Sequence, residues 1–531
     1  MTLSGILLIS SLVGVIVAGV DQRLDRLRRG RSEVVESDHT LLLGWSPKVP
    51  TLVRELIEAN ASEPSSCIVL MANRDVVDME EELEGRLRDF GTTRIVCRRG
   101  VPSDSDDLQL VSPADARTVV ILRPEERTGD AQVVRGVLAV LSQPNTAEVP
   151  IIAELADARL ARSLEEIMDS RVRTVESSQI IARLTVQACL FHGIGRVHEH
   201  LLGFLGNDLY THAEPAAIGL TFGEVARGFR TARPFGILSA DGTLALAPDR
   251  SKRLKAGDRI VLVSQDDSTI GAFQVTEPKR PSATSTRTRT RGPEHTLILG
   301  WSDLGPLVLA ELDRFSAPGS TVLVAVVPDF IDLDEIHPAF EFENLSIEKR
   351  AIDAHDPRRL AELIAAHDFH HILLLCYRGT LDPAEADALN LMTLLELRPA
   401  LSSTSGPTPG IVSELLDERD VQLAIRAESH DFIVSERLTA LLMLQVSEMP
   451  ELLDVWHELL DVDGAEISIV PATDYGLVPG AHSFGELVDA TLACNDALIG
   501  YRTDGSQLNI NPPLDHEMVL RAGDDLVVVT R

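Results

Sequence analysis

Positive charge is scarce in this sequence. Its 531 residues include 81 acidic and 49 basic residues, which gives a formal net charge of −32. Because a field of that sign repels phosphate backbones, the composition argues against nucleic acid as a partner. The length suggests roughly three or four domains of ordinary size rather than one core.

Cysteine is also rare. The five thiols, Cys67, Cys97, Cys189, Cys376 and Cys494, lie far apart, and no two of them form a CxxC pair. Three of them lie in or beside apolar runs that have the character of strands. This spacing predicts reduced, buried thiols rather than disulfides or metal ligands.

Catalytic signatures are missing as well. No His/Asp or Lys/Tyr pair has a catalytic spacing, and His198 and His200 lie two residues apart, which on a helix directs them about 200° apart and away from one zinc ion. We therefore expect a protein that is not an enzyme. The alternative class is an NAD-binding, oxidoreductase-like protein, and a third is a membrane-anchored regulatory or scaffolding protein without a pore of its own.

The N-terminus carries the longest apolar run. Leu3–Val20 is uncharged over 18 residues, close to the roughly 20 that cross a bilayer as a helix, and five arginines follow between residues 22 and 31. A secretory signal would place its positive charge before the run. The pattern predicts a transmembrane helix over residues 1–21 and a basic linker over 22–38, with the rest of this single-pass chain cytoplasmic. A signal peptide or a buried helix is the alternative.

The sequence of one predicted strand and its following turn occurs twice in the chain. HTLLLGWS occupies His39–Ser46, and HTLILGWS occupies His295–Ser302. After each copy, apolar strands alternate with helical stretches, which is typical of a parallel sheet covered on both faces. The pattern predicts an α/β fold with Rossmann-like domains over residues 39–205 and 295–460.

A second repeat follows each sheet. LKAGDRIVLV ends near Ser264 and LRAGDDLVVV near Thr530, and both are preceded by the triplet FGE and a polar turn with glycine. These segments predict a small α+β domain over residues 206–277 and another over 461–531. Between the halves, residues 278–294 are rich in Pro, Ser, Thr and Arg and are predicted to be a flexible linker.

The first βα turns are incomplete versions of a nucleotide-binding turn. A GxGxxG motif needs three glycines, but serine takes the second position in both copies and only the second copy has the third glycine. Either a nucleotide still binds here, or Trp45 and Trp301 are packing residues and the serines are N-caps. The candidate contacts for a nucleotide such as NAD are Gly44, Ser46, Asp75, Gly300, Ser302, Gly305 and Asp329.

Acidic residues gather in several short runs. Calcium takes six to eight oxygen ligands, and a loop can place several carboxylates on one ion. Asp104, Asp106 and Asp107 lie in such a predicted loop, after the third strand, and are the candidate calcium ligands. No run has the order of an EF-hand, and the alternative is that these residues are solvated.

The stretch RRGRSEVVESDHTLLLGWS, together with the apolar run before it and the duplicated domains after it, resembles the CASTOR/POLLUX family of ion channels. The resemblance covers essentially the whole chain. It implies two tandem RCK (regulator of potassium conductance) units, each with an RCK-N and an RCK-C domain. It also implies a homo-tetramer whose cytosolic gating ring regulates a potassium or calcium-regulated cation channel.

The sequence departs from that family at its start. The family's channels have further membrane helices and a selectivity filter before this point, whereas this sequence has one apolar run and no TVGYG-like loop. We expect either that the assigned start is too late and the pore lies upstream, or that a separate pore subunit is the partner; the first is favoured because the segment has the form of an inner pore helix.

Overall fold

The computed structural model describes most of the chain after residue 31. The described residues are 32–531 without 88, 127, 169–170, 204–205, 275–291, 337–340, 353–355, 403–407, 427–430 and 504–506. Within these ranges no helix is both long and apolar enough to cross a bilayer. The predicted transmembrane helix over 1–21 and residues 278–291 of the predicted linker lie outside the described residues.

The chain divides into two compact units. One contains the described residues up to Ser177 together with Met443–Pro450, and the other contains Ser178–Leu442 and Glu451–Arg531. The second unit therefore holds both small domains and the second sheet domain. The domain boundaries stated above remain predictions, since this division follows contacts rather than the sequence repeat.

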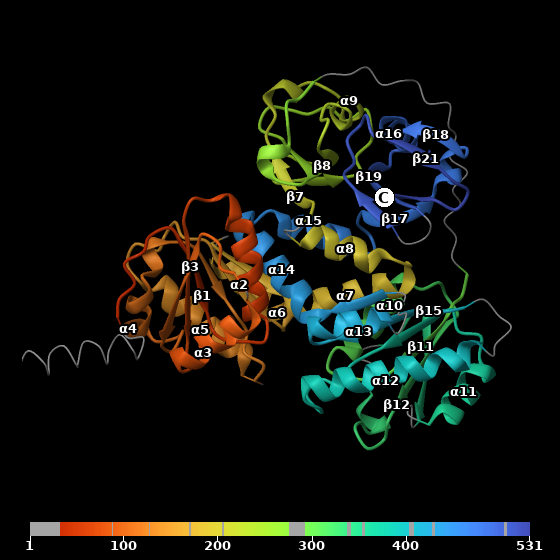
Figure 1. Ribbon diagram of the computed structural model, residues 1–531, viewed down its shortest axis with the longest axis horizontal. Helices are drawn as coiled ribbons and strands as arrows, with labels where there is room; N and C mark the ends of the chain where they lie inside the picture. The colour runs from red at the N-terminus through yellow and green to blue at the C-terminus, as the bar shows by residue number, and fades with distance from the viewer. Residues whose placement is uncertain are drawn as a thin grey trace, which may run out of the picture. The chain divides into compact units, whose positions relative to one another are not determined.

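The first unit is built on a six-stranded parallel sheet in the order β3-β2-β1-β4-β5-β6. Its strands β1 and β5 are buried along their whole length, as expected where helices cover both faces (Figure 1). The elements are β1 His39–Leu43, α2 Val49–Ala59, β2 Ser66–Ala72, α3 Val76–Arg86, β3 Thr93–Arg99, α4 Ser105–Leu108, β4 Ala116–Ile121, α5 Gly129–Leu141, β5 Ile151–Leu155, α6 Ala158–Met168 and β6 Val172–Glu176.

The second sheet repeats this order as β13-β12-β11-β14-β15-β16, which confirms the predicted pair of Rossmann-like domains. Sequence reasoning missed β16, which has only four residues. The elements are β11 His295–Leu299, α10 Gly305–Phe315, β12 Ser320–Val326, β13 Leu345–Ala351, α11 Pro357–Ala366, β14 His371–Leu374, α12 Pro383–Ser402, β15 Gly410–Leu415, α13 Val421–Arg426 and β16 Asp431–Val434.

Two helix pairs follow the sheets: α7 Ser177–Leu190 with α8 Ile194–Leu202, and α14 Ser435–Glu448 with α15 Leu452–Leu460. His198 of α8 is fully buried with its ring 6.1 Å from that of Trp456 on α15. Burial lowers the pKa of His198 to about 3, so its imidazole is neutral in the fold. Helix α8 runs through both His198 and His200, so the helical geometry that argued against a shared zinc ion is found in the structure.

The two small domains also share one topology. Their antiparallel sheets run in the orders β7-β10-β8-β9 and β17-β22-β19-β20. Their elements are β7 Asp208–His212, α9 Phe222–Ala226, β8 Arg233–Leu238, β9 Leu244–Leu246 and β10 Arg259–Ser264, then β17 Glu466–Pro471, β18 Gly480–Ser483, α16 Phe484–Leu492, β19 Ala497–Thr503, β20 Gln507–Ile510, β21 Glu517–Leu520 and β22 Asp525–Thr530.

The sequence repeats of the small domains have local structural causes. In each FGE triplet the glutamate, Glu224 or Glu486, closes a capping box at the start of its helix. In each LxxGD turn the glycine has positive φ, +89° at Gly257 and +109° at Gly523. The aspartate after each glycine accepts a hydrogen bond from the backbone N–H of the residue three positions before that aspartate. The repeats therefore encode a helix start and a tight turn.

Candidate functional site

Each six-stranded sheet has a point where its strand order reverses, between β1 and β4 and between β11 and β14. In open α/β sheets, ligands bind in the crevice outside the carboxyl ends of the strands at this switch point. Gly44 directly follows β1 and Gly300 directly follows β11. The predicted turn glycines therefore lie at the expected place in the fold.

Both turn glycines are required by the backbone itself. Gly44 has φ +104° and Gly300 has φ +89°. A Cβ atom added at Gly44 would lie 3.0 Å from the carbonyl oxygen of Leu122, and one added at Gly300 would lie 2.1 Å from that of Leu375. Crowding by the neighbouring strand thus explains these glycines without a bound pyrophosphate.

We expect Gly300→Ala to destabilise the second sheet domain by at least about 3 kcal/mol, because left-handed strain adds to a backbone collision. Gly379→Ala is the matched control, since Gly379 also has positive φ but nothing would lie within 4 Å of an added Cβ. The control should cost about 1–2 kcal/mol. Hydrogen exchange of β11 and β14 amides measures both, and equal losses would contradict the crowding at Gly300.

The second turn is occupied by its own tryptophan. Trp301 is 4% exposed, and a Cβ added at Gly305 would lie 2.6 Å from its ring, so Gly305 allows this ring to pack on the start of α10. The serines are not the N-caps, which are Lys48 for α2 and Leu304 for α10. Instead the Ser302 hydroxyl accepts a hydrogen bond from the Leu304 N–H at 3.3 Å. The N-cap interpretation of the serines was therefore wrong.

The remaining candidate nucleotide contacts have other structural roles than the two turn glycines. Asp75 is the N-cap of α3 and accepts the N–H of Val77 at 3.0 Å. Asp329 is exposed after β12. In the first copy Trp45 is half-buried, with the Arg74 guanidinium 4.5 Å from its ring centre. A nucleotide at these residues stays a prediction.

A duplicated glutamate that sequence reasoning missed lies at each switch point. Glu154 is the next-to-last residue of the run IIAEL on β5, Glu414 is the next-to-last residue of IVSEL on β15, and each is 1% exposed. Glu154 accepts the Arg123 N–H at 3.1 Å, and Glu414 accepts the Cys376 N–H at 2.9 Å. The shared pattern of two apolar residues, a small residue, Glu and Leu was the available signal.

Each glutamate is neutralised by a cation from a different element. Lys48 at the start of α2 pairs with Glu154 at 3.0 Å, with both side chains at most 7% exposed. Arg378, after β14, donates through Nε to Glu414 at 2.8 Å and through Nη1 to Glu436 at 3.0 Å. Buried charges persist only when paired in this way. The protein's own ion pairs thus occupy the carboxyl ends of the central strands.

A second carboxylate is duplicated beside each glutamate. Asp130 on α5 accepts the N–H groups of Ala156 and Asp157 at 3.2 and 3.0 Å. Asp387 on α12 accepts those of Leu416 and Asp417, both at 2.8 Å. Burial raises the pKa of Asp387 to about 6. These aspartates fasten the loop after β5 or β15 to a helix, which stiffens the same edge of each sheet.

Little free space remains at the second switch point. The cavity beside Gly300, bounded also by Val327, Tyr377 and Asn390, has a volume of about 10 Å³. That volume holds about one water molecule at most. The Tyr377 hydroxyl accepts the Val327 N–H at 3.0 Å across it. The geometry favours a rigid, internally filled edge over an open nucleotide cleft.

The predicted calcium ligands form one helix start. The Asp104 carboxylate accepts the N–H groups of Asp106 and Asp107 and so caps α4, while Asp107 accepts the N–H of Val101 at 2.9 Å. In the described part of the chain no group of three or more His, Cys, Asp or Glu side chains is arranged to hold a metal ion. Calcium at these three aspartates stays a prediction.

The expectation of buried cysteines holds for three of the five thiols, whereas Cys67 and Cys494 are half-buried. All five are free, and Cys97, Cys189 and Cys376 are buried. Burial raises the pKa of Cys97 to about 12, so that thiol is protonated and unreactive at neutral pH.

Comparison with known proteins gives these repeats a context. Residues 178–279 match the family described as "Castor and Pollux, part of voltage-gated ion channel". The ion channel CASTOR of Lotus japonicus is 29% identical over 96% of this chain and 64% of its own length. The probable ion channel CASTOR of Oryza sativa subsp. japonica is 30% identical over 96% of this chain and 62% of its own length. The chain thus spans slightly less than two thirds of these relatives.

A solved structure supports the fold independently. The human SLO3 gating ring superposes with a TM-score of 0.64 at 14% sequence identity, covering 92% of this chain and 99% of that one. At this identity the likeness concerns the fold alone. The chain is thus similar in sequence to the CASTOR and POLLUX ion channels along nearly its whole length, and similar in fold to the SLO3 gating ring.

Proposed function

We propose that this chain is the regulatory, gating-ring portion of a cation channel of the CASTOR/POLLUX type and couples ligand binding in its RCK units to a membrane pore. The observation that carries this proposal is the similarity to ion channels along nearly the whole chain. The duplicated domains support it, because a gating device needs rigid bodies that move and not a reaction centre. No enzymatic activity is proposed.

The switch-point ion pairs suit that mechanical role. The Glu154 and Glu414 carboxylates tie neighbouring strands and helices together in a buried setting, where breaking a pair is costly. Each sheet domain would therefore move as a rigid body. Ligand binding would change which arrangement of these rigid domains is most populated, without deforming the sheets.

The start of the described chain supplies a candidate for the coupling element. Residues 32–38, the end of the predicted basic linker, are fixed to the first sheet domain. The Val34 N–H donates to Leu110 O at 2.8 Å, and the Ser112 hydroxyl donates to Val34 O at 3.1 Å. The Val34 side chain is 4% exposed in the core. Motion of this domain would thus be passed directly to the residues that precede it.

Calcium is the regulatory ligand that the proposal favours. Asp104, Asp106 and Asp107 lie at the start of α4, which continues into the short 3-10 helix Gln109–Val111 that contains Leu110, the hydrogen-bond partner of Val34. An ion bound at these carboxylates would act on the anchor of the linker through this one short helix. The ligand set is incomplete within the described residues, so a neighbouring subunit would have to complete it.

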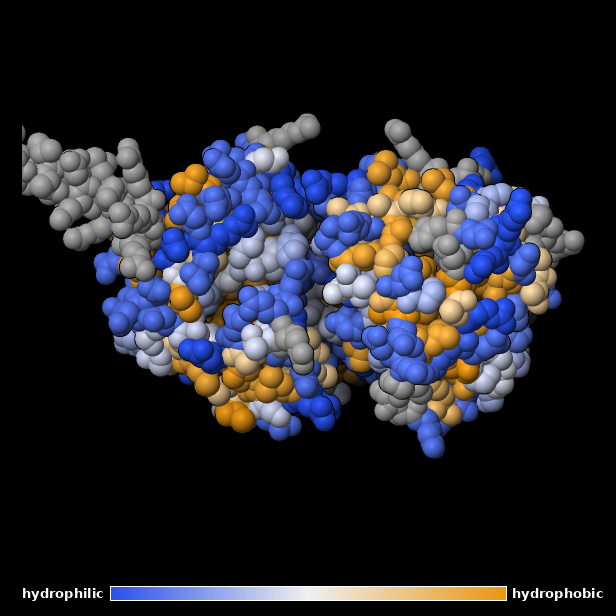
Figure 2. Space-filling model, turned by 90° about the horizontal axis from the view of Figure 1, so that it is seen from below, coloured by the Kyte–Doolittle hydropathy of each residue, from blue (hydrophilic) through white to orange (hydrophobic). Residues whose placement is uncertain are grey.

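The proposed gating-ring portion would assemble with other copies of the chain. Helix α12 exposes Met392 and Leu395, which lie three residues apart on one face, at 51% and 57%. Figure 2 shows hydrophobic residues gathered on the face of the second sheet domain that includes α12. Exposed apolar patches of this kind mark interaction sites. We propose that this face contacts another copy of the chain in a ring, with a tetramer as the expected assembly.

The proposed function is tested by cation flux in membrane vesicles from cells that carry the intact gene region, compared with cells in which the codons for residues 39–531 are deleted. The expected result is a potassium flux that responds to calcium in the first and has lost that response in the second. Unchanged calcium-dependent flux would contradict the proposal. A substrate-dependent change in nicotinamide absorbance by the purified chain would instead support the oxidoreductase alternative.

A further inference from the structure

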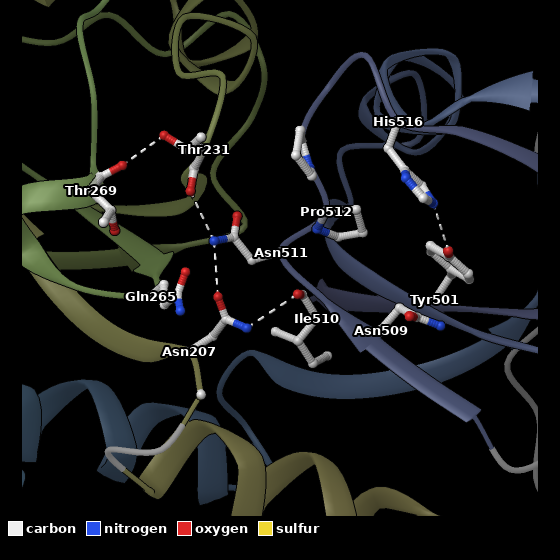
Figure 3. Close-up of a pocket in the computed structure, with 12 residues that line it drawn as sticks. Asn207, Thr231, Gln265, Thr269, Tyr501, Asn509, Ile510, Asn511, Pro512 and His516 are labelled. Atoms are coloured by element: carbon white, nitrogen blue, oxygen red, sulfur yellow. Dashed lines mark hydrogen bonds between the residues drawn. The ribbon is translucent and has the colours of Figure 1, made fainter. Parts of the chain in front are cut away.

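A pocket of about 560 Å³ lies between the two small domains of the second unit (Figure 3). The two small sheets meet through β8 and β19, which lie side by side in Figure 1. The pocket is lined from both domains, by Gly206, Asn207, Thr231, Gln265 and Thr269 on one side and by Tyr501, Asn509, Ile510, Asn511, Pro512, Pro513 and His516 on the other. Its volume is in the range of small-molecule sites, roughly 300–1,000 Å³.

The lining has a distinct chemistry. Its polar groups are four amides, two threonine hydroxyls, a phenol and an imidazole, and its apolar groups are aromatic rings and prolines. Among these twelve lining residues there is no carboxylate, lysine or arginine. Such a surface does not compensate the charge of a phosphate or a metal ion, whereas it can satisfy the donors and acceptors of a neutral molecule.

The back of the pocket is fixed before any ligand arrives. The Asn511 amide donates to Asn207 Oδ1 at 3.0 Å and to Thr231 O at 2.9 Å, which joins the two domains. Buried Arg233 donates through Nε to Asn511 Oδ1 at 3.2 Å. Asn511 also has positive φ, +55°, which asparagine tolerates better than most residues. The strained residue is held from both sides, so this wall is preorganised.

Two other amides are available to a ligand. Gln265 is exposed on the first wall and Asn509 is half-buried on the second. The Gln265 side chain has no hydrogen-bond partner among the residues that the structure describes, and the Asn509 amide makes only a long contact, 3.5 Å, to Gln507 O. Each amide presents a donor and an acceptor side by side, which is the complement of a nucleobase edge.

Flat surfaces complete the site. The Tyr501 and His516 rings are inclined by only 22°, and the Tyr501 hydroxyl lies 3.0 Å from His516 Nε2. Figure 3 shows this pair and Pro512 on the side of the pocket contributed by the second small domain. Aromatic and proline faces stack on planar heterocycles, and proteins read unstacked bases by such stacking together with hydrogen bonds to the base edge.

We propose that this pocket binds a nucleoside, with Gln265 and Asn509 reading the edge of the base and the exposed His516 ring, packed beside the largely buried Tyr501 and Pro512, supporting its plane. A bound nucleoside would touch both small domains and stabilise their pairing by mass action. The inference rests on the pocket alone and holds whether or not the chain regulates an ion channel.

The test is calorimetric titration of the full chain in detergent with adenosine, guanosine, cytidine and uridine, with ribose and inorganic phosphate as comparison probes. At least one nucleoside should bind saturably, and Gln265→Leu should weaken it about tenfold through loss of one hydrogen-bonded edge. Gln507→Leu, an exposed change on the strand that carries Asn509 but outside the lining, should leave binding unchanged. Both changes are on the surface, so both variants should fold.

Three results would overturn the assignment. No nucleoside binds, ribose or phosphate binds as tightly as the nucleosides, or Gln507→Leu weakens binding as much as Gln265→Leu. Loss of ion flux with intact nucleoside binding would count against the proposed function and leave this site standing.

Discussion

Glu414→Leu is expected to lower the stability of the second sheet domain by about 3–5 kcal/mol. The change leaves the half-buried Arg378 guanidinium without its main carboxylate, and it also removes the acceptor of the Cys376 N–H and of the Ser435 hydroxyl. Because a chain of several domains does not unfold in one step, the measurement is hydrogen exchange of β14 and β15 amides. Their protection should fall by roughly two to four orders of magnitude.

The matched control for this change is Glu348→Leu. Glu348 also lies on a strand of the second sheet and pairs with an arginine, Arg350, but its side chain is 55% exposed. An exposed pair contributes about 0–1 kcal/mol, so this variant should keep nearly all of its protection. If both variants lose the same protection, the switch-point pair does not hold the sheet together as described.

Asp431→Asn is expected to remove a large pH dependence of stability. Asp431 on β16 is 2% exposed, and burial raises its pKa to about 7. Between about pH 4 and pH 7 the folded chain keeps a proton that the unfolded chain releases, so stability falls as pH rises through this window. The shift corresponds to about 4 kcal/mol at pH 8. Asparagine cannot release that proton.

The design of that test follows the groups around Asp431. Its carboxylate accepts the Gly195 N–H at 3.0 Å, and Arg196 and Glu199 are the charged neighbours that act on it. Protection of β16 amides should fall between pH 4.5 and pH 8 in the unmodified chain and change much less in Asp431→Asn. Other titrating groups are common to both proteins and cancel in the comparison. An identical pH dependence in the two would mean that Asp431 is ionised in the fold.

Most of the fold could be predicted because its signals are local. The runs HTLLL and HTLIL are continuous apolar strands, and the LxxGD turns need glycine for a backbone reason that is visible in the sequence. Strand β16 was missed because four residues give too short a pattern to separate from the following helix α14.

The interior of the switch points could not be predicted, because its partners come from distant elements. Lys48 reaches Glu154 from a helix start, whereas the equivalent glutamate in the second sheet, Glu414, is neutralised by Arg378 from the loop after β14. A repeat shows that two glutamates correspond but not which cation pairs with each. The role of Gly305 could not be predicted either, because it depends on the position of the Trp301 ring, which only the structure shows.

In the proposed coupling, the first sheet domain moves the chain that precedes it through the anchored residues 32–38. The most direct measurement is calcium-dependent potassium flux in vesicles carrying Val34→Asp, compared with Val35→Asp. Val34 is 4% exposed and its neighbour Val35 is 89% exposed, so only the first change puts a charge into the anchor. Val34→Asp is expected to abolish the calcium response, whereas Val35→Asp is expected to retain it. A full calcium response in Val34→Asp would contradict the proposed coupling.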